Sequence, residues 1–328
     1  MEKPASHNQL IRQHSDLFEE LSELVHGWEL DFCQLGRADA PFYLQQVEGP
    51  SILISRAFFA SSFYQVGSAP PGYRTISMLV PRAGNTSWRW CGESVAPGSL
   101  LVMPVGGEFE SISAPNFESI HLAIPIPLLE QIAETQFNLP LQSLMPDTRC
   151  FCRQGGEPLQ SLRSLLKRLT RGPEQVCSPG ALWLTPRLER EMAFLVLACL
   201  AGGGAELPRG PRSGRMKCLA RAIEILNEAD SSFMEVGELV SVVDVSRRTL
   251  ENAFSDGLGV GPAAFLKSRR LHRLNRALLA ADPSLESVAT VAKAHGFQHL
   301  GQLATDYRSL FGELPSATLK RVSGRRAI

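Results

Sequence analysis

The chain has 328 residues, of which 44% are hydrophobic and 20% charged, and its 33 basic residues balance its 33 acidic ones. This length suggests two globular domains, each large enough for a core of its own, and the composition is ordinary for a soluble protein. No apolar run is long enough to cross a bilayer, and the polar N-terminus lacks the hydrophobic region of a signal peptide. We therefore expect a cytoplasmic protein without a membrane partner.

The neutral total hides a difference in charge between two parts of the chain. Residues 1–211 carry 16 Lys and Arg against 21 Asp and Glu, a net charge of −5, whereas residues 212–328 carry 17 against 12, a net charge of +5. A basic C-terminal module beside a more acidic domain is typical of nucleic-acid-binding proteins.

Seven cysteines are scattered along the sequence, an odd number without the spacing of a disulfide framework. We expect reduced thiols, with redox or metal sensing as the alternative. Cys150 and Cys152 form a Cys-x-Cys pair but lack the second pair that a structural zinc site requires. The sequence therefore predicts no metal site, no cofactor and no catalytic residues.

The N-terminal part is predicted to be rich in β structure. Residues 9–26 have the spacing of a leading amphipathic helix. From about Trp28 to Pro127, short apolar runs are separated by Gly and Pro turns, which indicates a sandwich, a barrel or a jelly roll. The runs are SILISRAFF, YRTISMLV, SLLVMP and SIHLAIPI.

Helical periodicity follows Pro127. The segments PLLEQIAETQF and PLQSLRSLLKRL have apolar residues at helical spacing, and Thr185 is placed to cap a helix that begins at Pro186. The apolar stripe of that last helix either packs inside its own domain or pairs two subunits. The stripe consists of Leu188, Met192, Leu195, Val196 and Cys199.

A Gly- and Pro-rich stretch, residues 201–214, is the clearest linker between domains. We predict a first domain over residues 1–200, this linker, and a second domain over residues 215–322. The predicted fold class is α+β: a β-rich N-terminal domain with flanking helices, followed by an all-α C-terminal domain.

The C-terminal region contains two copies of one helical unit. The stretches VSRRTLENAFSDGLGVGPA and GFQHLGQLATDYRSLFGELPS share their order of Leu, aromatic, Gly and Pro residues, which indicates a repeated supersecondary unit. Upstream of the turn the offset is 52 rather than 53, so the second copy has one extra turn residue. The matched pairs are Leu250 and Leu303, Phe254 and Tyr307, Gly259 and Gly312, Pro262 and Pro315, Leu239 and Val291, and Val245 and Phe297.

Each copy has the pattern of a helix-turn-helix. The first helices have the buried faces Val236, Leu239, Val240 and Val243, and Val288, Val291 and Ala292. Ser246 and Ser287 are placed as N-caps, and Gly296 provides a residue with positive φ for the second turn. The second helices bury Leu250 and Phe254 in one copy and Leu300, Leu303, Tyr307, Leu310 and Phe311 in the other.

The polar faces left outside are suited to the edges of bases in a major groove. Arg pairs with guanine, Asn and Gln with adenine, and Glu with cytosine. The alternative, two generic helical hairpins with solvated faces, is disfavoured by the matched repeat. The predicted DNA-binding residues are Arg247, Arg248, Thr249, Glu251 and Asn252 in the first copy, and Gln298, His299, Gly301, Gln302, Thr305 and Arg308 in the second.

A basic helix connects the two copies. Its apolar face consists of Phe265, Leu266, Leu271, Leu274 and Leu278, and its cations are Lys267, Arg269, Arg270, Arg273 and Arg276. Such a helix would hold the two units in a fixed relation, so that both recognition helices enter successive major grooves on one face of the DNA. We expect Ser246, Lys267 and Arg270 to contact the phosphate backbone.

These segments and their spacing resemble the AraC/XylS family of bacterial transcription regulators over about residues 215–321. The resemblance implies a tandem helix-turn-helix domain that binds double-stranded promoter DNA and activates transcription through RNA polymerase. By position it implies base contacts by Arg248, Glu251 and Asn252, and by Gly301, Gln302 and Thr305 with His299 beside them. Val240, Asp244 and Glu235 depart from the pattern of the first unit and imply looser packing there.

The N-terminal part more loosely resembles the cupin-like sensor domains attached to such regulators, as in SVAPGSLLVMPVGGEFE. The histidines nearest to the β strands are His26, just before the β region, and His121 within it, without a His-x-His pair, so a catalytic cupin is disfavoured. A sensor pocket would be apolar with a few polar anchors. Trp and Arg side chains suit a small organic anion, and the effector-binding residues that we predict are Arg74, Arg82, Trp88, Arg89 and Trp90.

The sequence thus predicts a DNA-binding transcription regulator, not an enzyme, that forms a homodimer and responds to a small-molecule effector. Two alternatives stay open. One is a cupin-type metalloenzyme with an accessory DNA-binding tail. The other is a regulator without a ligand, controlled by its abundance or by a protein partner.

Overall fold

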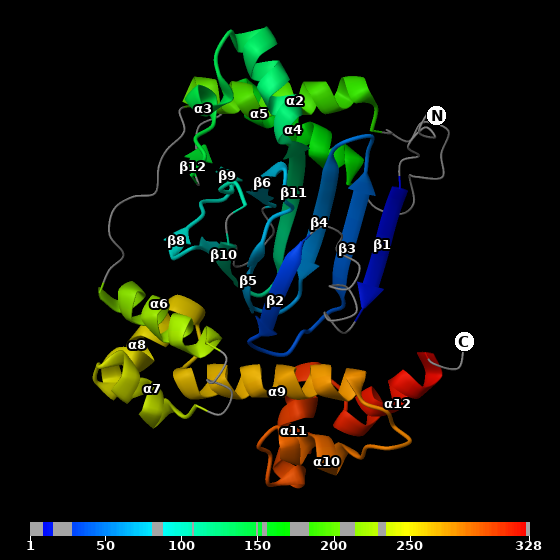
Figure 1. Ribbon diagram of the computed structural model, residues 1–328, viewed down its shortest axis with the longest axis vertical. Helices are drawn as coiled ribbons and strands as arrows, with labels where there is room; N and C mark the ends of the chain where they lie inside the picture. The colour runs from blue at the N-terminus through cyan, green and yellow to red at the C-terminus, as the bar shows by residue number, and fades with distance from the viewer. Residues whose placement is uncertain are drawn as a thin grey trace.

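The computed structural model describes residues 9–15, 28–80, 88–106, 108–148, 150–152, 156–170, 184–203, 214–228 and 234–325. These residues form an N-terminal β-sandwich with its own helices and a helical C-terminal domain. In Figure 1 the sandwich lies between two groups of helices, one from each part of the chain. Within the described residues, no helix is long and apolar enough to cross a membrane.

The larger sheet of the sandwich has seven described strands, all paired antiparallel. Its central strand pairs with a neighbour at each edge: Leu122 stands opposite Ile54 on one neighbouring strand and opposite Ile76 on the other. In spatial order the strands are β1 (Gln9–Ser15), β3 (Phe42–Glu48), β4 (Leu53–Phe59), β11 (Phe117–Pro125), β6 (Tyr73–Leu79), β9 (Leu100–Val102) and β12 (Cys150–Cys152).

The smaller sheet has five described strands and packs against the larger one through an aromatic core. Trp90 stacks on Phe109 with ring centroids 4.4 Å apart, and Trp88 meets Trp90 edge to face at 5.6 Å. Side chains alternate between the two faces of a strand, so the other face of this sheet is left for the C-terminal domain. The strands in order are β2 (Glu29–Gln34), β5 (Phe63–Ser68), β10 (Glu108–Ser113), β7 (Trp88–Trp90) and β8 (Glu93–Ser94).

The outer face of the larger sheet is covered by the helices that follow β11. They are α2 (Ile126–Ile132) with its π-helical continuation η1 (Ala133–Phe137), α3 (Leu141–Leu144), α4 (Gly156–Leu169) and α5 (Pro186–Gly203). Their apolar residues form one buried cluster with those of the sheet. The sandwich is therefore one wall of a core that these helices complete.

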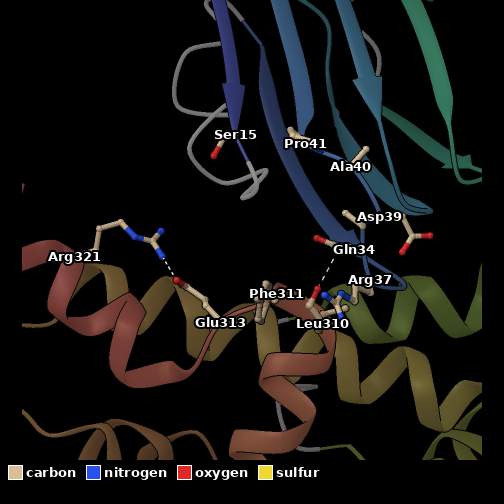
Figure 2. Close-up of a pocket in the computed structure, with 12 residues that line it drawn as sticks. Ser15, Gln34, Arg37, Asp39, Ala40, Pro41, Leu310, Phe311, Glu313 and Arg321 are labelled. Atoms are coloured by element: carbon tan, nitrogen blue, oxygen red, sulfur yellow. Dashed lines mark hydrogen bonds and ion pairs between the residues drawn. The ribbon is translucent and has the colours of Figure 1, made fainter.

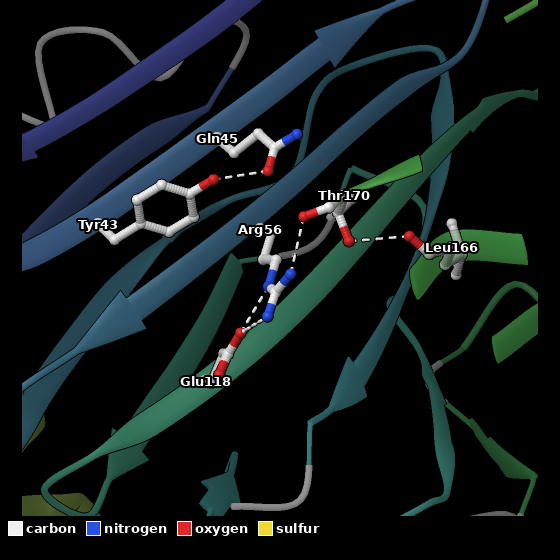
Figure 3. Close-up of polar contacts among 6 residues, drawn as sticks. All are labelled: Tyr43, Gln45, Arg56, Glu118, Leu166 and Thr170. Carbon is white, nitrogen blue, oxygen red and sulfur yellow. Dashed lines mark hydrogen bonds and ion pairs between the residues drawn. The ribbon is translucent and has the colours of Figure 1, made fainter. Parts of the chain in front are cut away.

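Polar contacts fix these helices at defined places on the sheet. Figure 3 shows Arg56 of β4 paired with Glu118 of β11 while it donates to the carbonyl oxygen of Thr170, 2.7 Å away at the end of α4. On α5, the buried carboxylate of Glu189 accepts hydrogen bonds from the backbone N–H groups of Ser51 and Ile52. Charge-assisted bonds of this kind are about twice as strong as neutral ones, so α4 and α5 belong to the N-terminal domain.

The structure confirms most predicted elements of the N-terminal part and corrects one. Each of the four quoted runs contains a strand, and the Thr185 hydroxyl caps α5 by accepting from the N–H of Leu188. The prediction of a leading helix over residues 9–26 was wrong for Gln9–Ser15, because these residues form a strand that pairs with β3. Residues 16–26 lie outside the described residues. The α5 stripe packs in its own domain, with Met192, Val196 and Cys199 buried.

Candidate DNA-binding interface

The first helix-turn-helix unit consists of α7 (Val236–Val243) and α8 (Arg247–Leu258), supported by α6 (Gly214–Asn227). Leu239, Leu250 and Phe254 are fully buried at its centre, and the ring of Phe254 meets Phe265 edge to face at 5.5 Å. This confirms the apolar faces expected for the first copy. Glu235 precedes α7, and its backbone N–H donates to the Glu238 carboxylate at 2.8 Å. The side chain of Glu238 therefore satisfies a backbone donor at the start of this helix.

The second unit consists of α10 (Val288–Ala294) and α11 (Leu300–Phe311), closed by α12 (Pro315–Arg325). Leu303 and Tyr307 are buried, as predicted, and the Tyr307 hydroxyl accepts a 2.7 Å hydrogen bond from Asn275. Leu300 departs from the prediction: it is 45% exposed at the first position of α11. A residue there lies beside the turn rather than over the core.

The repeated Gly and Pro residues have the same structural role in both units. Gly259 and Gly312 have φ values of 73° and 79°, and each ends a recognition helix in the left-handed conformation that suits glycine. Pro262 and Pro315 then occupy the first position of the following helix, where a missing N–H costs nothing. The shared order of residues therefore encodes one helix end and one helix start in each copy.

The predicted base-contacting residues lie on surfaces open to solvent. Arg248 is exposed, and Arg247, 70% exposed, pairs with Glu251 of the next turn at 3.1 Å. Thr249 and Asn252 are half-buried, and the Thr249 N–H is held by the capping hydroxyl of Ser246. In the second unit the exposed members of the set are Gln298, His299, Gly301, Gln302, Thr305 and Arg308.

Helix α9 (Pro262–Ala280) connects the two units and packs against both. Its 19 residues make it about 28 Å long, a length of the same order as one turn of B-DNA, about 34 Å. Phe265 near its start belongs to the core of the first unit, and Leu274 and Leu278 belong to the core of the second. Figure 1 shows the second unit beneath α9, on the side away from the sandwich, and the first unit beside the start of α9.

The cations of α9 have different surroundings. Lys267 is 54% exposed and pairs with Asp306 of α11 at 3.1 Å, whereas Arg270 is half-buried. Arg269 donates to the carbonyl oxygen of Leu226 at the end of α6. Arg273 and Arg276 face the sandwich, where Arg276 pairs with Asp31 of β2 at 2.8 Å. Burial, together with the charges of Arg269 and Arg276, lowers the pKa of Arg273.

The sandwich contacts both helix-turn-helix units through its smaller sheet. The backbone N–H of Gln34, at the end of β2, donates to Nε2 of buried His272 on α9 at 2.8 Å. As Figure 2 shows, the Gln34 side chain reaches the carbonyl oxygen of Leu310 on α11, 3.2 Å away. Tyr64 of β5 packs edge to face on Phe265 at 5.4 Å. Sequence reasoning missed these contacts, because His272 and Gln34 are 238 positions apart.

The predicted effector residues do not come together. Trp88 and Trp90 line a cavity between the two sheets. Arg74 is 1% exposed and donates to the carbonyl oxygen of Pro146 at 2.7 Å, and Arg89 points to Met216 of α6. Arg82 lies outside the described residues. In the described residues, no three His, Cys, Asp or Glu side chains meet as a possible metal site.

Comparison with known proteins agrees with this architecture. Residues 239–321 match a family model described as a helix-turn-helix domain. The chain is 25% identical over 256 residues to XylDLEGF operon transcriptional activator 1 of Pseudomonas putida, covering 76% of this chain and 77% of that one. It is 31% identical over 155 residues to a probable thc operon regulatory protein of Rhodococcus erythropolis, covering 46% and 47%.

Among solved structures, the AraC-like transcriptional activator CuxR matches with a TM-score of 0.42 and 14% identity, covering 81% of this chain and 94% of that chain. The two exposed recognition helices, the helix that joins them and the matched domain define a DNA-binding transcription regulator. The matched domain and these relatives support a regulator of the AraC/XylS type.

Proposed function

We propose that this regulator activates transcription by placing α8 and α11 in successive major grooves of a promoter and by contacting RNA polymerase, as a cytoplasmic homodimer. The observation that supports it most is the exposure of both recognition faces while the sandwich is docked on α9. DNA binding therefore requires no separation of the two domains. The names of the Pseudomonas relatives support activation. They disfavour the alternative of a cupin-type enzyme.

The residues of the two faces suit different parts of the DNA. Arg248 is suited to a guanine edge and Gln302 to an adenine edge. Leu300, which the sequence placed in the core, is exposed where an apolar side chain would meet a thymine methyl group. Ser246, Lys267 and Arg270 are assigned to the phosphate backbone, which positions the protein without specifying sequence. Arg270 is half-buried, so we expect Lys267 to contribute more.

Binding to the protein's own promoter site tests these roles. Arg248→Ala and Gln302→Ala should each weaken specific binding by about 1–3 kcal/mol and relax the preference at one base pair. Arg221→Ala on α6 is the matched control, since it removes an exposed Arg that pairs with Glu224 of its own helix. Equal effects of Arg248→Ala and Arg221→Ala on base preference would contradict the assignment.

We also propose that the N-terminal domain senses a small molecule in the cavity between its two sheets. This cavity is lined by aromatic side chains with a few polar groups, which is the usual character of a small-molecule site. We propose this cavity as the binding site in place of the arginines predicted from the sequence, because Arg74 and Arg89 make contacts elsewhere. A ligand that binds only the folded protein raises its melting temperature, so thermal-shift screening tests the proposal.

A further inference from the structure

The cavity between the sheets has walls made of aromatic rings. It is lined by Trp28, Trp88 and Trp90, together with Phe59, Phe109 and Phe117, and its volume is about 60 Å³. That is room for a few water molecules and less than the roughly 150 Å³ of a cavity known to take up benzene, so even a single ring enters only by moving the walls apart. Flat aromatic faces at these positions favour a planar apolar group in stacked or edge-to-face contact.

One polar group in these walls lacks a partner. Trp90 is only 1% exposed, so water does not reach its indole N–H, and this N–H has no hydrogen-bond acceptor within the described structure. The neighbouring Trp88 differs, because its N–H donates to the Ser111 hydroxyl at 2.7 Å. An unsatisfied buried donor destabilises the folded state. A ligand that brings an acceptor to Trp90 would recover that cost.

The described lining of the cavity contains no Asp, Glu, Lys or Arg. Its one titratable imidazole, His121, lies 2.7 Å from the Ser77 hydroxyl and 2.9 Å from the Ser119 hydroxyl. Burial lowers the pKa of His121 to about 4, so the ring is neutral near pH 7. Transfer of an unpaired carboxylate into such surroundings is costly, which disfavours the organic anion expected from the sequence.

We infer that the cavity takes an uncharged single-ring aromatic molecule with an oxygen acceptor, and that this oxygen accepts the hydrogen bond of the Trp90 N–H. The inference rests on the proposed ligand sensing by this domain and names the class of effector. Trp90 positions the ligand by its N–H, and the surrounding rings hold the ligand by stacking.

Titration calorimetry on the full chain with benzamide, benzoate and toluene tests the inference. Benzamide has a neutral acceptor, benzoate is its charged counterpart of similar shape, and toluene has the ring alone. We expect benzamide to bind at least tenfold more tightly than either of the other two. Trp90→Phe keeps a ring but removes the donor, and should reduce the advantage of benzamide over toluene by about tenfold.

Trp88→Phe is the matched control, since its N–H already has a partner in Ser111, and it should keep that advantage. Benzoate binding as tightly as benzamide would overturn the inference, as would an equal loss in both Trp variants or the absence of binding by all three probes. Footprinting of the same preparation on promoter DNA separates these failures from a failure of the proposed regulator, because it requires no ligand.

A separate observation concerns strand β2, whose two faces touch different parts of the molecule. Leu30 lines the cavity and Phe32 packs in the aromatic core. On the other face, Asp31 pairs with Arg276, and Cys33 lies in the core shared with α6 and α9. Gln34 at the end of the strand bonds to His272 and to the carbonyl oxygen of Leu310. One strand thus separates the cavity from the helices that carry both recognition helices.

We infer that β2 transmits the state of the cavity to the DNA-binding domain. Leu30→Ala should change promoter affinity by at least threefold, because it alters packing on the strand that contacts α9. Leu44→Ala, on β3 of the other sheet, removes the same side chain from the same cavity and should leave promoter affinity within twofold. Equal effects of the two substitutions, or no effect of Leu30→Ala in a folded protein, would refute this route.

Discussion

The two helix-turn-helix units share one plan but stabilise it differently. In the first, Asp244 adopts the left-handed turn conformation at φ 57° and Ser246 caps the recognition helix. In the second, Gly296 takes the left-handed position at φ 78°, and His299 starts α11 without a side-chain cap. The buried aromatic residue is apolar Phe254 in one unit and hydrogen-bonded Tyr307 in the other.

This difference shows that the repeated Leu, Gly and Pro residues define the geometry while other residues set the local stability. The first unit depends on a cap and on apolar packing, and the second on polar bonds to α9 and α12. Native-state hydrogen exchange measures the free energy of opening in each recognition helix separately. Substitutions that act on one unit and spare the other therefore test the comparison within one chain.

The largest effect is expected from Phe254→Ala. Phe254 is fully buried between α8 and α9, and removal of a core aromatic side chain costs about 3–5 kcal/mol. The free energy of opening of α8 should fall by that amount, while that of α11 changes much less. A loss under about 1 kcal/mol in α8 would mean that this residue is not central to the unit.

Tyr307→Phe should lower the free energy of opening of α11 by about 1–2 kcal/mol. The substitution keeps the ring but leaves the Asn275 amide and the Thr318 hydroxyl, 2.7 and 2.9 Å from the Tyr307 oxygen, without that partner. The same measurement on α8 is the internal control. An unchanged α11 would show that the polar bonds do not stabilise the second unit.

Ser246→Ala should cost about 1 kcal/mol in α8, because the hydroxyl accepts from the N–H of Thr249 at 3.1 Å. Ser255→Ala is the matched control, since Ser255 is exposed later on the same helix. We expect that control to leave the opening free energy within about 0.5 kcal/mol. If both substitutions had equal effects, the cap would not be the cause.

The smallest effect is expected from Asp244→Gly. Glycine lacks the Cβ that makes a left-handed conformation costly, and the gain is partly offset by its greater freedom in the unfolded chain. The free energy of opening of the first unit should rise by about 0.5 kcal/mol. Gly296→Ala should lower that of the second unit, and a rise there would contradict the role given to this turn.

The helical repeat was predictable because its signals are local: caps, positive-φ glycines and apolar residues at fixed spacing. Gly296, Ser287 and the buried Leu303 were all expected from sequence. The strand Gln9–Ser15 was not, because its pairing with β3 depends on residues more than 25 positions away. Leu300 was misplaced because helical spacing alone does not tell where a core ends.

The candidate ligand site was less predictable than the DNA-binding face. Trp88 and Trp90 were expected, but the sheet topology alone brings them together with Trp28, Phe117 and His121. Arg74 was expected in the site and instead lies buried beside Pro146. The docking of Gln34 on His272 joins residues from the two domains, and no local pattern in the sequence indicates it.

The account depends most on both recognition helices binding one face of the DNA together. Hydroxyl-radical footprinting and methylation protection of the full chain on its promoter measure this directly. We expect two protected major-groove patches about one helical turn apart, roughly 10 base pairs, on the same face of the duplex. Protection of a single groove, or binding no tighter than to random DNA at matched salt, would contradict it.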